Sequence, residues 1–142
     1  MSSWTGREIL DLTFTVADDE TITGYQVVEI NDDDDLRYDA MQVKVCTNAS
    51  GYPIGIAQVD DYQTVSAGET VTVRLRGVSK AISNTHTNIS AGDACSPGAA
   101  GRCDTAATES HTWNLGRAIT RAEQLFDEFT VLIDPDEWID YP

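Results

Sequence analysis

The stretch that decides the fold is Thr70-Val71-Thr72-Val73-Arg74-Leu75-Arg76. Its apolar and polar residues alternate one by one, which is the period of a β-strand with one face in a core and the other in water. Valine and threonine also favour strands, because their branched side chains pack well on a pleated surface. This stretch therefore predicts a strand, and the rest of the chain can be compared with it.

Six more segments share this character. Leu10, Leu12, Phe14 and Val16 alternate with polar residues in the same way. The other candidate strands are residues 24–30, 41–45, 53–59, 113–119 and 129–133. Glycine, asparagine, aspartate and serine, the usual turn formers, occupy the connections. Short strands joined by turns predict an all-β fold, a sandwich or barrel of antiparallel strands.

The length of the chain sets the expected domain organisation. Its 142 residues fit one domain with a core of its own. We expect a single β-domain with short extensions at residues 1–8 and 135–142. Only Ile119–Phe126 places apolar residues on one helical face, so the chain is expected to hold at most one short helix. The alternative for this segment is a loop that leads into the last strand.

The charge balance argues against several partners. The chain carries 9 Lys+Arg against 24 Asp+Glu, a formal net charge of -15. Nucleic-acid binding needs clustered Lys and Arg, and an anionic membrane would repel this chain, so we expect neither partner. No apolar run is long enough for a transmembrane helix, and charged residues among the first sixteen do not fit a secretory signal.

The kind of acid is as informative as its amount. The chain has 16 Asp, 8 Glu, 7 Arg and only 2 Lys, spread nearly everywhere apart from one run at Asp32–Asp35. In molar salt the Debye length falls to about 3 Å, so an acidic coat costs little stability and keeps the surface hydrated. This composition resembles that of proteins from extreme halophiles, salt-accumulating archaea in particular. The alternative is an ordinary acidic protein.

The three cysteines leave two readings open. Cys95 and Cys103 bracket a loop rich in proline, glycine and alanine, which either closes through a disulfide or carries two free thiols. Cys46 stands apart from them. No Cys-x-x-Cys occurs and the two histidines lack ligand spacing, so we expect no zinc site.

Two parts of the chain contain similar strings in the same order. Ile54-Gly55-Ile56-Ala57 precedes the strand at 70–76, and Leu115-Gly116-Arg117-Ala118 precedes the strand at 129–133. A glycine-containing turn and a strand come before each string. The shared order suggests an internal duplication, although an all-β chain also shows chance echoes.

The same strings carry a family resemblance. They are Ile54–Ala57, Ser66–Val78, Ile89–Ala94 and Leu115–Ala118, in that order and spacing. Over about residues 9–134 the chain resembles a family of small capsid decoration, or head-stabilising, proteins of tailed viruses. The acidic segment Asp32–Asp39 and the loop between Cys95 and Cys103 depart from the family pattern.

The resemblance implies an assembly role with no catalytic residues to carry over. It implies a small β-domain on the capsid exterior of a virion, usually a homotrimer, that bridges subunits of the major capsid protein. Joined to the acidic composition, it implies a tailed virus of haloarchaea.

The search for chemistry finds no catalytic motif. Gly-x-Ser-x-Gly, a Walker loop and Gly-x-Gly-x-x-Gly are all absent, so we expect no enzyme and no cofactor. Asp32, Asp33, Asp34 and Asp35 form either a loop that binds a hard cation or a solvated loop, because the glycine and glutamate spacing of an EF-hand is missing. Asn48 and Asn88 stand in glycosylation sequons.

The candidate interface residues are aromatic residues and arginines. They are Trp4, Arg7, Arg74, Arg76, Trp138 and Tyr141. Aromatic side chains at chain ends are costly to leave in water and are enriched at interfaces, although they can also fold back on their own core. Arg74 and Arg76, on the polar face of the clearest strand, pair with acids either of a neighbouring subunit or of this fold.

Two other functions stay open. A turret or tail component of a virion would use the same β-domain. A halophilic carbohydrate-binding sandwich would present an exposed aromatic platform, for which Trp4, Trp113 and Trp138 are the tryptophan candidates.

Overall fold

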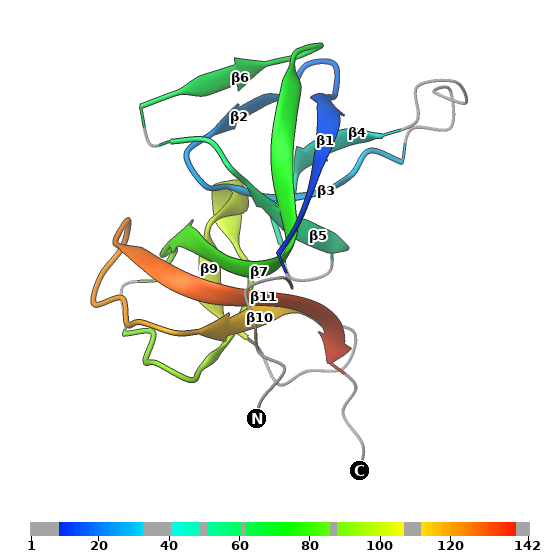
Figure 1. Cartoon of the computed structure of the whole chain (residues 1–142). Helices are drawn as coiled ribbons and strands as arrows, with labels where there is room; N and C mark the ends of the chain where they lie inside the picture. Colours follow the sequence, from blue (N-terminus) through cyan, green and yellow to red (C-terminus); the bar gives the residue numbers. More distant parts are fainter. Residues whose placement is uncertain are drawn as a thin grey trace.

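The computed structural model describes residues 9–32, 41–48, 51–60, 62–85, 88–106 and 112–138 (Figure 1). Its strands are β1 (Leu10–Val16), β2 (Thr21–Thr23), β3 (Val27–Ile30), β4 (Gln42–Val45), β5 (Pro53–Ala57), β6 (Thr64–Ser66), β7 (Thr70–Ile82), β8 (Ala94–Pro97), β9 (Cys103–Thr105), β10 (Thr112–Ala118) and β11 (Glu128–Trp138). The 3-10 turn Ala99–Gly101 is the only helical element in these ranges, and none of the described segments is a helix able to cross a membrane. The predicted all-β fold of short strands is confirmed.

The longest strand, β7, belongs to both halves of the molecule. Residues 70–76 pair antiparallel with β1, and residues 77–82 pair antiparallel with β11. Gly77 stands at the change of partner with φ of 111°, a conformation that residues other than glycine rarely adopt. Val71 and Val73 are buried, as the alternation of 70–76 predicts, and the strand bends beyond them (Figure 1).

The first half closes into a ring of five strands. Their order is β1-β4-β3-β5-β7, and β7 pairs back with β1. The neighbours run antiparallel except β1 and β4, which are parallel with Thr15 opposite Gln42. The short strands β2 and β6 form a separate two-stranded sheet. We call residues 10–76 the first barrel.

The second half repeats this ring. Its order is β7-β11-β10-β8-β9, and Ser83 beyond the end of β7 forms a parallel bridge with Cys103 of β9. The Asn84 backbone N–H donates to the Cys103 carbonyl at 2.8 Å, just as Ala17 donates to Val43 at 2.9 Å in the first barrel. Both rings share their strand order and their one parallel contact, so the internal duplication is present in the fold. We call residues 77–138 the second barrel.

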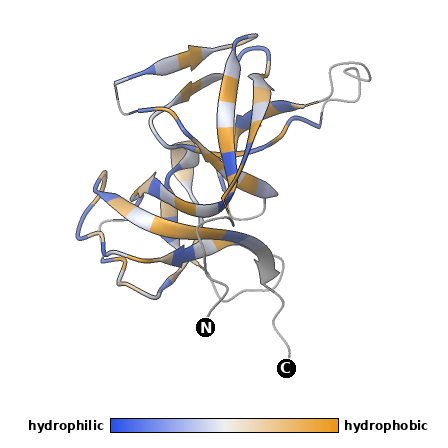
Figure 2. Cartoon of the chain, in the orientation of Figure 1, coloured by the Kyte–Doolittle hydropathy of each residue, from blue (hydrophilic) through white to orange (hydrophobic). Residues whose placement is uncertain are grey.

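Each barrel has its own apolar interior, and the two share a wall. Val28 and Ala57 point into the first core, while their neighbours Val27 and Ile56 join the second. All four side chains are fully buried, so β3 and β5 are covered on both faces. Figure 2 shows apolar and polar residues interspersed along the strands of both barrels. Because no linker separates the cores, the two barrels form a continuous body.

The two cores fill the same space with different residues. Phe14 lies opposite Val71 in the first barrel, and Ala81 lies opposite Phe129 in the second. All four are buried. Large and small side chains have exchanged places across the same pair of strands, which keeps the total volume similar.

Of the two possibilities for Ile119–Phe126, a short helix or a loop that leads into the last strand, the structure has the loop. Ala122 forms an antiparallel bridge with Ile89, and a turn follows it. The Asp127 carboxylate accepts hydrogen bonds from the backbone N–H groups of Glu123 and Gln124 at 2.9 and 3.1 Å, which holds the chain in that turn. Long-range pairing and a local carboxylate therefore outweigh the helical spacing of the apolar residues.

The boundaries also differ in detail from the expectation. Residues 24–26 form a turn before β3, and β11 continues to Trp138, so that residues 135–138 are strand and not part of an extension. The strands β2, β6, β8 and β9 were not predicted, because each has only three or four residues and too little alternation to detect.

Candidate functional site

Arg74, a candidate for contacts between subunits, has its partners within the chain. Its Nε and Nη2 donate to the two carboxylate oxygens of Asp11 at 2.9 and 3.0 Å, across β1 and β7. Its Nη1 donates to the Val78 carbonyl at 2.8 Å. The Asp11 hydrogen bond raises the pKa of Arg74, which remains a cation. Three of the five N–H groups of this guanidinium are thus bound within its own fold, and its charge is paired with Asp11.

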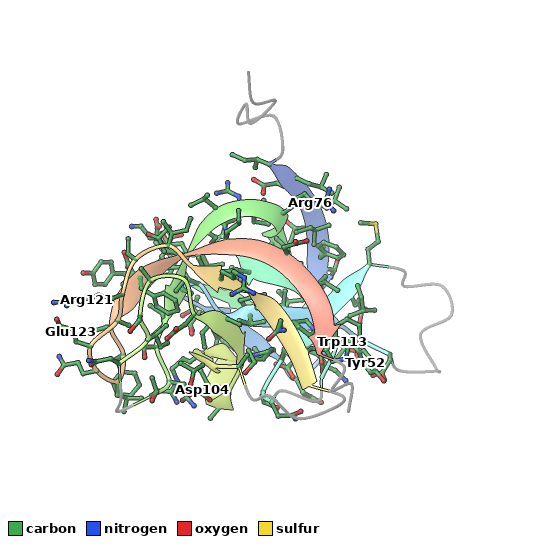
Figure 3. All side chains as sticks on the ribbon, turned by 90° about the horizontal axis from the view of Figure 1, so that it is seen from below. Tyr52, Arg76, Asp104, Trp113, Arg121 and Glu123 are labelled. Carbon is green, nitrogen blue, oxygen red and sulfur yellow. The ribbon has the colours of Figure 1, made fainter. Side chains whose placement is uncertain are left out.

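The other predicted surface residues are placed unevenly. Arg76 is exposed, projects beside β1 (Figure 3) and has no ion pair within the described residues. Trp4, Arg7 and Tyr141 lie outside those residues. Trp138 ends β11 opposite Thr112, but its side chain is not among those described. The sequon residues Asn48 and Asn88 are both exposed.

The acidic run meets a lysine at its start. The Lys44 Nζ lies 2.9 Å from Asp32 and 3.7 Å from Glu29. The hydrogen bond from Lys44 holds the pKa of Asp32 below its usual value. Asp33, Asp34 and Asp35 lie outside the described residues, and within those residues no group of three or more His, Cys, Asp and Glu is placed to hold a metal ion.

The three cysteines are free and buried. On the paired strands β8 and β9, Cys95 lies opposite Thr105 and Cys103 lies opposite Pro97, so the two thiols are diagonal neighbours. Diagonal positions keep Cβ atoms farther apart than the roughly 4 Å of a disulfide. The loop is thus held by strand pairing, and the disulfide is absent from the structure.

The first barrel shows what these cysteines do. By the register of the two rings, Cys95 stands where Val28 stands, opposite Gly116 as Val28 is opposite Gly55. Cys103 stands where Val43 stands, at the parallel contact that closes the ring. Burial raises the pKa of Cys95 to about 12 and that of Cys103 well above its usual value. These thiols pack as small apolar side chains and are not reactive groups.

The aromatic pair that joins the two barrels does not form a flat platform. The rings of Tyr52 and Trp113 lie side by side (Figure 3) with centroids 5.3 Å apart and an interplanar angle of 64°. Sugar rings stack on a flat aromatic face, which an edge-to-face pair does not extend. The pair therefore favours a contact between the barrels over a carbohydrate site.

A second aromatic group was not anticipated from the sequence. Phe126 is 63% exposed at the tip of the turn before β11. The Arg102 guanidinium lies over its ring, 4.6 Å from the centroid. Alignment of the two halves of the sequence could have revealed this group. Gln124-Leu125-Phe126-Asp127 stands where Ser66-Ala67-Gly68-Glu69 stands in the first barrel, so large apolar residues replace alanine and glycine at the tip of the turn.

Charge is divided unequally between the barrels. Residues 10–76 contain 13 Asp and Glu against 4 Lys and Arg, a net charge of -9. Residues 77–138, to the end of β11, contain 9 Asp and Glu against 4 Lys and Arg, a net charge of -5. The sequence of the first barrel is therefore the more acidic of the two.

Comparison with known proteins identifies the family of this chain. A family model described as phage cement protein matches residues 7–133. Among solved structures, the head fiber gp8.5 N base of bacteriophage phi29 is similar in fold, with a TM-score of 0.63 and 16% identity over 94% of this chain and 99% of that chain. No curated protein sequence matches the chain. Because the family model spans both barrels, the chain belongs to the phage cement protein family.

Proposed function

We propose that the protein decorates the capsid exterior of a tailed virus of haloarchaea, where a homotrimer bridges subunits of the major capsid protein in molar salt. The observation that carries the proposal is membership in the phage cement protein family, which makes the chain a capsid-associated structural protein. The archaeal host is inferred from the excess of aspartate over lysine, 16 against 2.

The fold suits a mechanical role. Strands β3, β5 and β7 contribute to both barrels, so a force on one barrel passes through paired strands into the other. A protein that joins neighbouring capsid subunits must resist their separation, and a specific interface of this kind buries about 1,200–2,000 Å² in total. Threefold repetition would multiply the strength of such contacts through avidity.

The net negative charge of each subunit makes contacts between subunits dependent on salt. Within the described residues, Lys44, Arg74, Lys80 and Arg121 each pair with an acid of the same chain. Few cations are left to offset the repulsion between neighbouring subunits that each carry -15. Contacts between subunits therefore depend on screening, which is strong in molar salt and weak at about 0.1 M.

Cosedimentation tests this function. Empty shells of the major capsid protein encoded in the same genome are mixed with the protein in molar KCl and at about 0.1 M KCl. We expect the protein to pellet with shells in molar salt and to detach at low salt, while circular dichroism confirms that it stays folded. Equal attachment at both salt concentrations would contradict the role of screening.

Sedimentation equilibrium tests the trimer. In molar KCl the mass should be three times the 15.5 kDa of the chain. A monomer that also fails to bind shells, but binds a polysaccharide, would overturn the proposal in favour of a carbohydrate-binding module.

A further inference from the structure

The turns before β7 and β11 are the same turn built twice. In the first barrel, the Ser66 backbone N–H donates to the Glu69 carboxylate at 3.0 Å, and Gly68 donates to the Val16 carbonyl at 2.9 Å. In the second barrel, Gln124 donates to the Asp127 carboxylate at 3.1 Å, and Phe126 donates to the Ser83 carbonyl at 2.9 Å. Both barrels thus contain the same turn with the same hydrogen bonds, but the residues at its tip differ.

The tip of the second turn is costly for the fold. Gly68 and Phe126 both have positive φ, of 82° and 70°. Glycine adopts this conformation freely, whereas a residue with a bulky side chain is strained in it. Phe126 also leaves most of its ring in water. The matched glycine shows that this turn can form without the strain or the exposed ring, so Phe126 is available for a role outside folding.

Arg102 places a cation over the exposed ring of Phe126. It stands just before β9, where the first barrel has Gln42, and its Nε donates to the Ala99 carbonyl at 3.2 Å. This bond holds the guanidinium over Phe126. Phenylalanine and arginine are both enriched in the cores of protein interfaces, and arginine is also enriched among the residues that dominate binding energy.

The location of the pair fits an approach to another acidic surface. Residues 77–138 of the second barrel carry -5, and residues 10–76 of the first carry -9. An acidic partner is repelled less by the second barrel, and Arg102 there can meet one of its carboxylates. Leu125, half-buried beside Phe126, widens the apolar tip.

We propose that the Leu125–Phe126 turn with Arg102 is the capsid-contacting surface, in which Phe126 enters an apolar hollow of the shell subunit and Arg102 pairs with a carboxylate on its rim. This inference rests on the proposed function. It assigns the less acidic second barrel to the capsid and leaves the strongly acidic first barrel toward the medium.

The test replaces the tip with its counterpart from the first barrel. Phe126→Gly in the full-length protein should weaken attachment to shells in molar KCl by about 10- to 100-fold, as expected from the loss of one buried aromatic contact. Its melting temperature should equal or exceed that of the wild type, because glycine relieves the strain at positive φ. Arg102→Gln, which copies Gln42, should weaken attachment by a smaller factor. The matched control is Tyr62→Ala in the first barrel, where a 98% exposed aromatic ring is removed and attachment should be unchanged.

The outcomes separate this inference from the function on which it rests. If the wild-type protein does not attach to shells, both the proposed function and this inference are wrong. Wild-type attachment with Phe126→Gly within about twofold of it overturns the inference and leaves the function standing. Loss of trimers by Phe126→Gly, measured by sedimentation without shells, also overturns it, because the tip would then contact a second copy of this chain.

Discussion

Gly55 of β5 and Gly116 of β10 occupy the same place in the two barrels and meet the same obstacle. A Cβ atom on Gly55 would collide with the carbonyl oxygen of Arg74 on β7, and one on Gly116 would collide with that of Leu132 on β11. In both barrels a neighbouring strand passes too close for any side chain. The x-Gly-x-Ala string that occurs twice in the sequence is thus a steric requirement of each ring.

Substitution of either glycine should be severe. Gly55→Ala and Gly116→Ala should each lower the free energy of unfolding by about 3 kcal/mol or more, because the obstacle is backbone and cannot rotate away. Gly68→Ala is the control, since nothing lies within 4 Å of its Cβ position and only its φ of 82° opposes alanine. It should cost about 1 kcal/mol. Guanidinium unfolding in molar salt measures all three, and equal midpoints for Gly55→Ala and Gly68→Ala would disprove the steric explanation.

The exchanged core pair can be transplanted. Phe14→Ala should cost about 3–5 kcal/mol through the cavity it leaves. Adding Val71→Phe copies the Ala81–Phe129 arrangement of the second barrel and should restore most of this loss. A double-mutant cycle by denaturant unfolding measures the coupling. Additive losses in the double variant would show that the two cores are not equivalent in shape.

The buried thiols predict a particular response to pH. Burial raises the pKa of Cys46 and Cys95 from 9.0 to about 12, so the folded protein keeps protons that the unfolded chain loses. Stability should be independent of these groups below pH 9 and should fall between pH 9 and about 12. Unfolding at a series of pH values measures this loss, and Cys95→Val/Cys103→Val, which copies Val28 and Val43, should reduce it.

Thiol chemistry gives an independent check on the same residues. A thiol reagent should leave the folded protein unmodified at neutral pH and react with three thiols after unfolding. A reducing agent should not change the melting temperature. A fall in melting temperature on reduction would instead indicate a disulfide between Cys95 and Cys103.

The two-pronged ion pair of β1 and β7 should resist salt. Arg74→Lys should lower the free energy of unfolding by about 1 kcal/mol, because an ammonium group cannot keep both bonds to Asp11 and the bond to Val78. The effect should persist in molar salt, since short hydrogen bonds are screened less than distant charges. Arg76→Lys on the same strand is the control and should be neutral. Equal effects of the two variants would mean that the bidentate geometry contributes nothing.

The strands could be predicted from the sequence more completely than the contacts of the site residues. The long alternating strand at 70–76 was predictable because each second residue must face a core, and the repeated x-Gly-x-Ala string pointed to duplication. For residues 119–126 the sequence left a short helix and a loop open, since the apolar spacing is local while the Ala122–Ile89 bridge that excludes the helix joins residues far apart in sequence. Arg74 looked available on the polar face of its strand, but only the register of β1 against β7 places Asp11 opposite it.

The sequence by itself determined an all-β chain and its acidic character, because these follow from a period of two along the backbone and from composition. Its repeated x-Gly-x-Ala string suggested two matching halves but left a chance repeat open. Only the tertiary structure decided that the halves are closed rings with a common wall, that Cys95 and Cys103 replace core valines, and that Phe126 is strained and exposed beside Arg102. The physical reason is that ring closure, burial and strain depend on which distant strands become neighbours. That choice is made by the packing of the whole chain and not by any one segment.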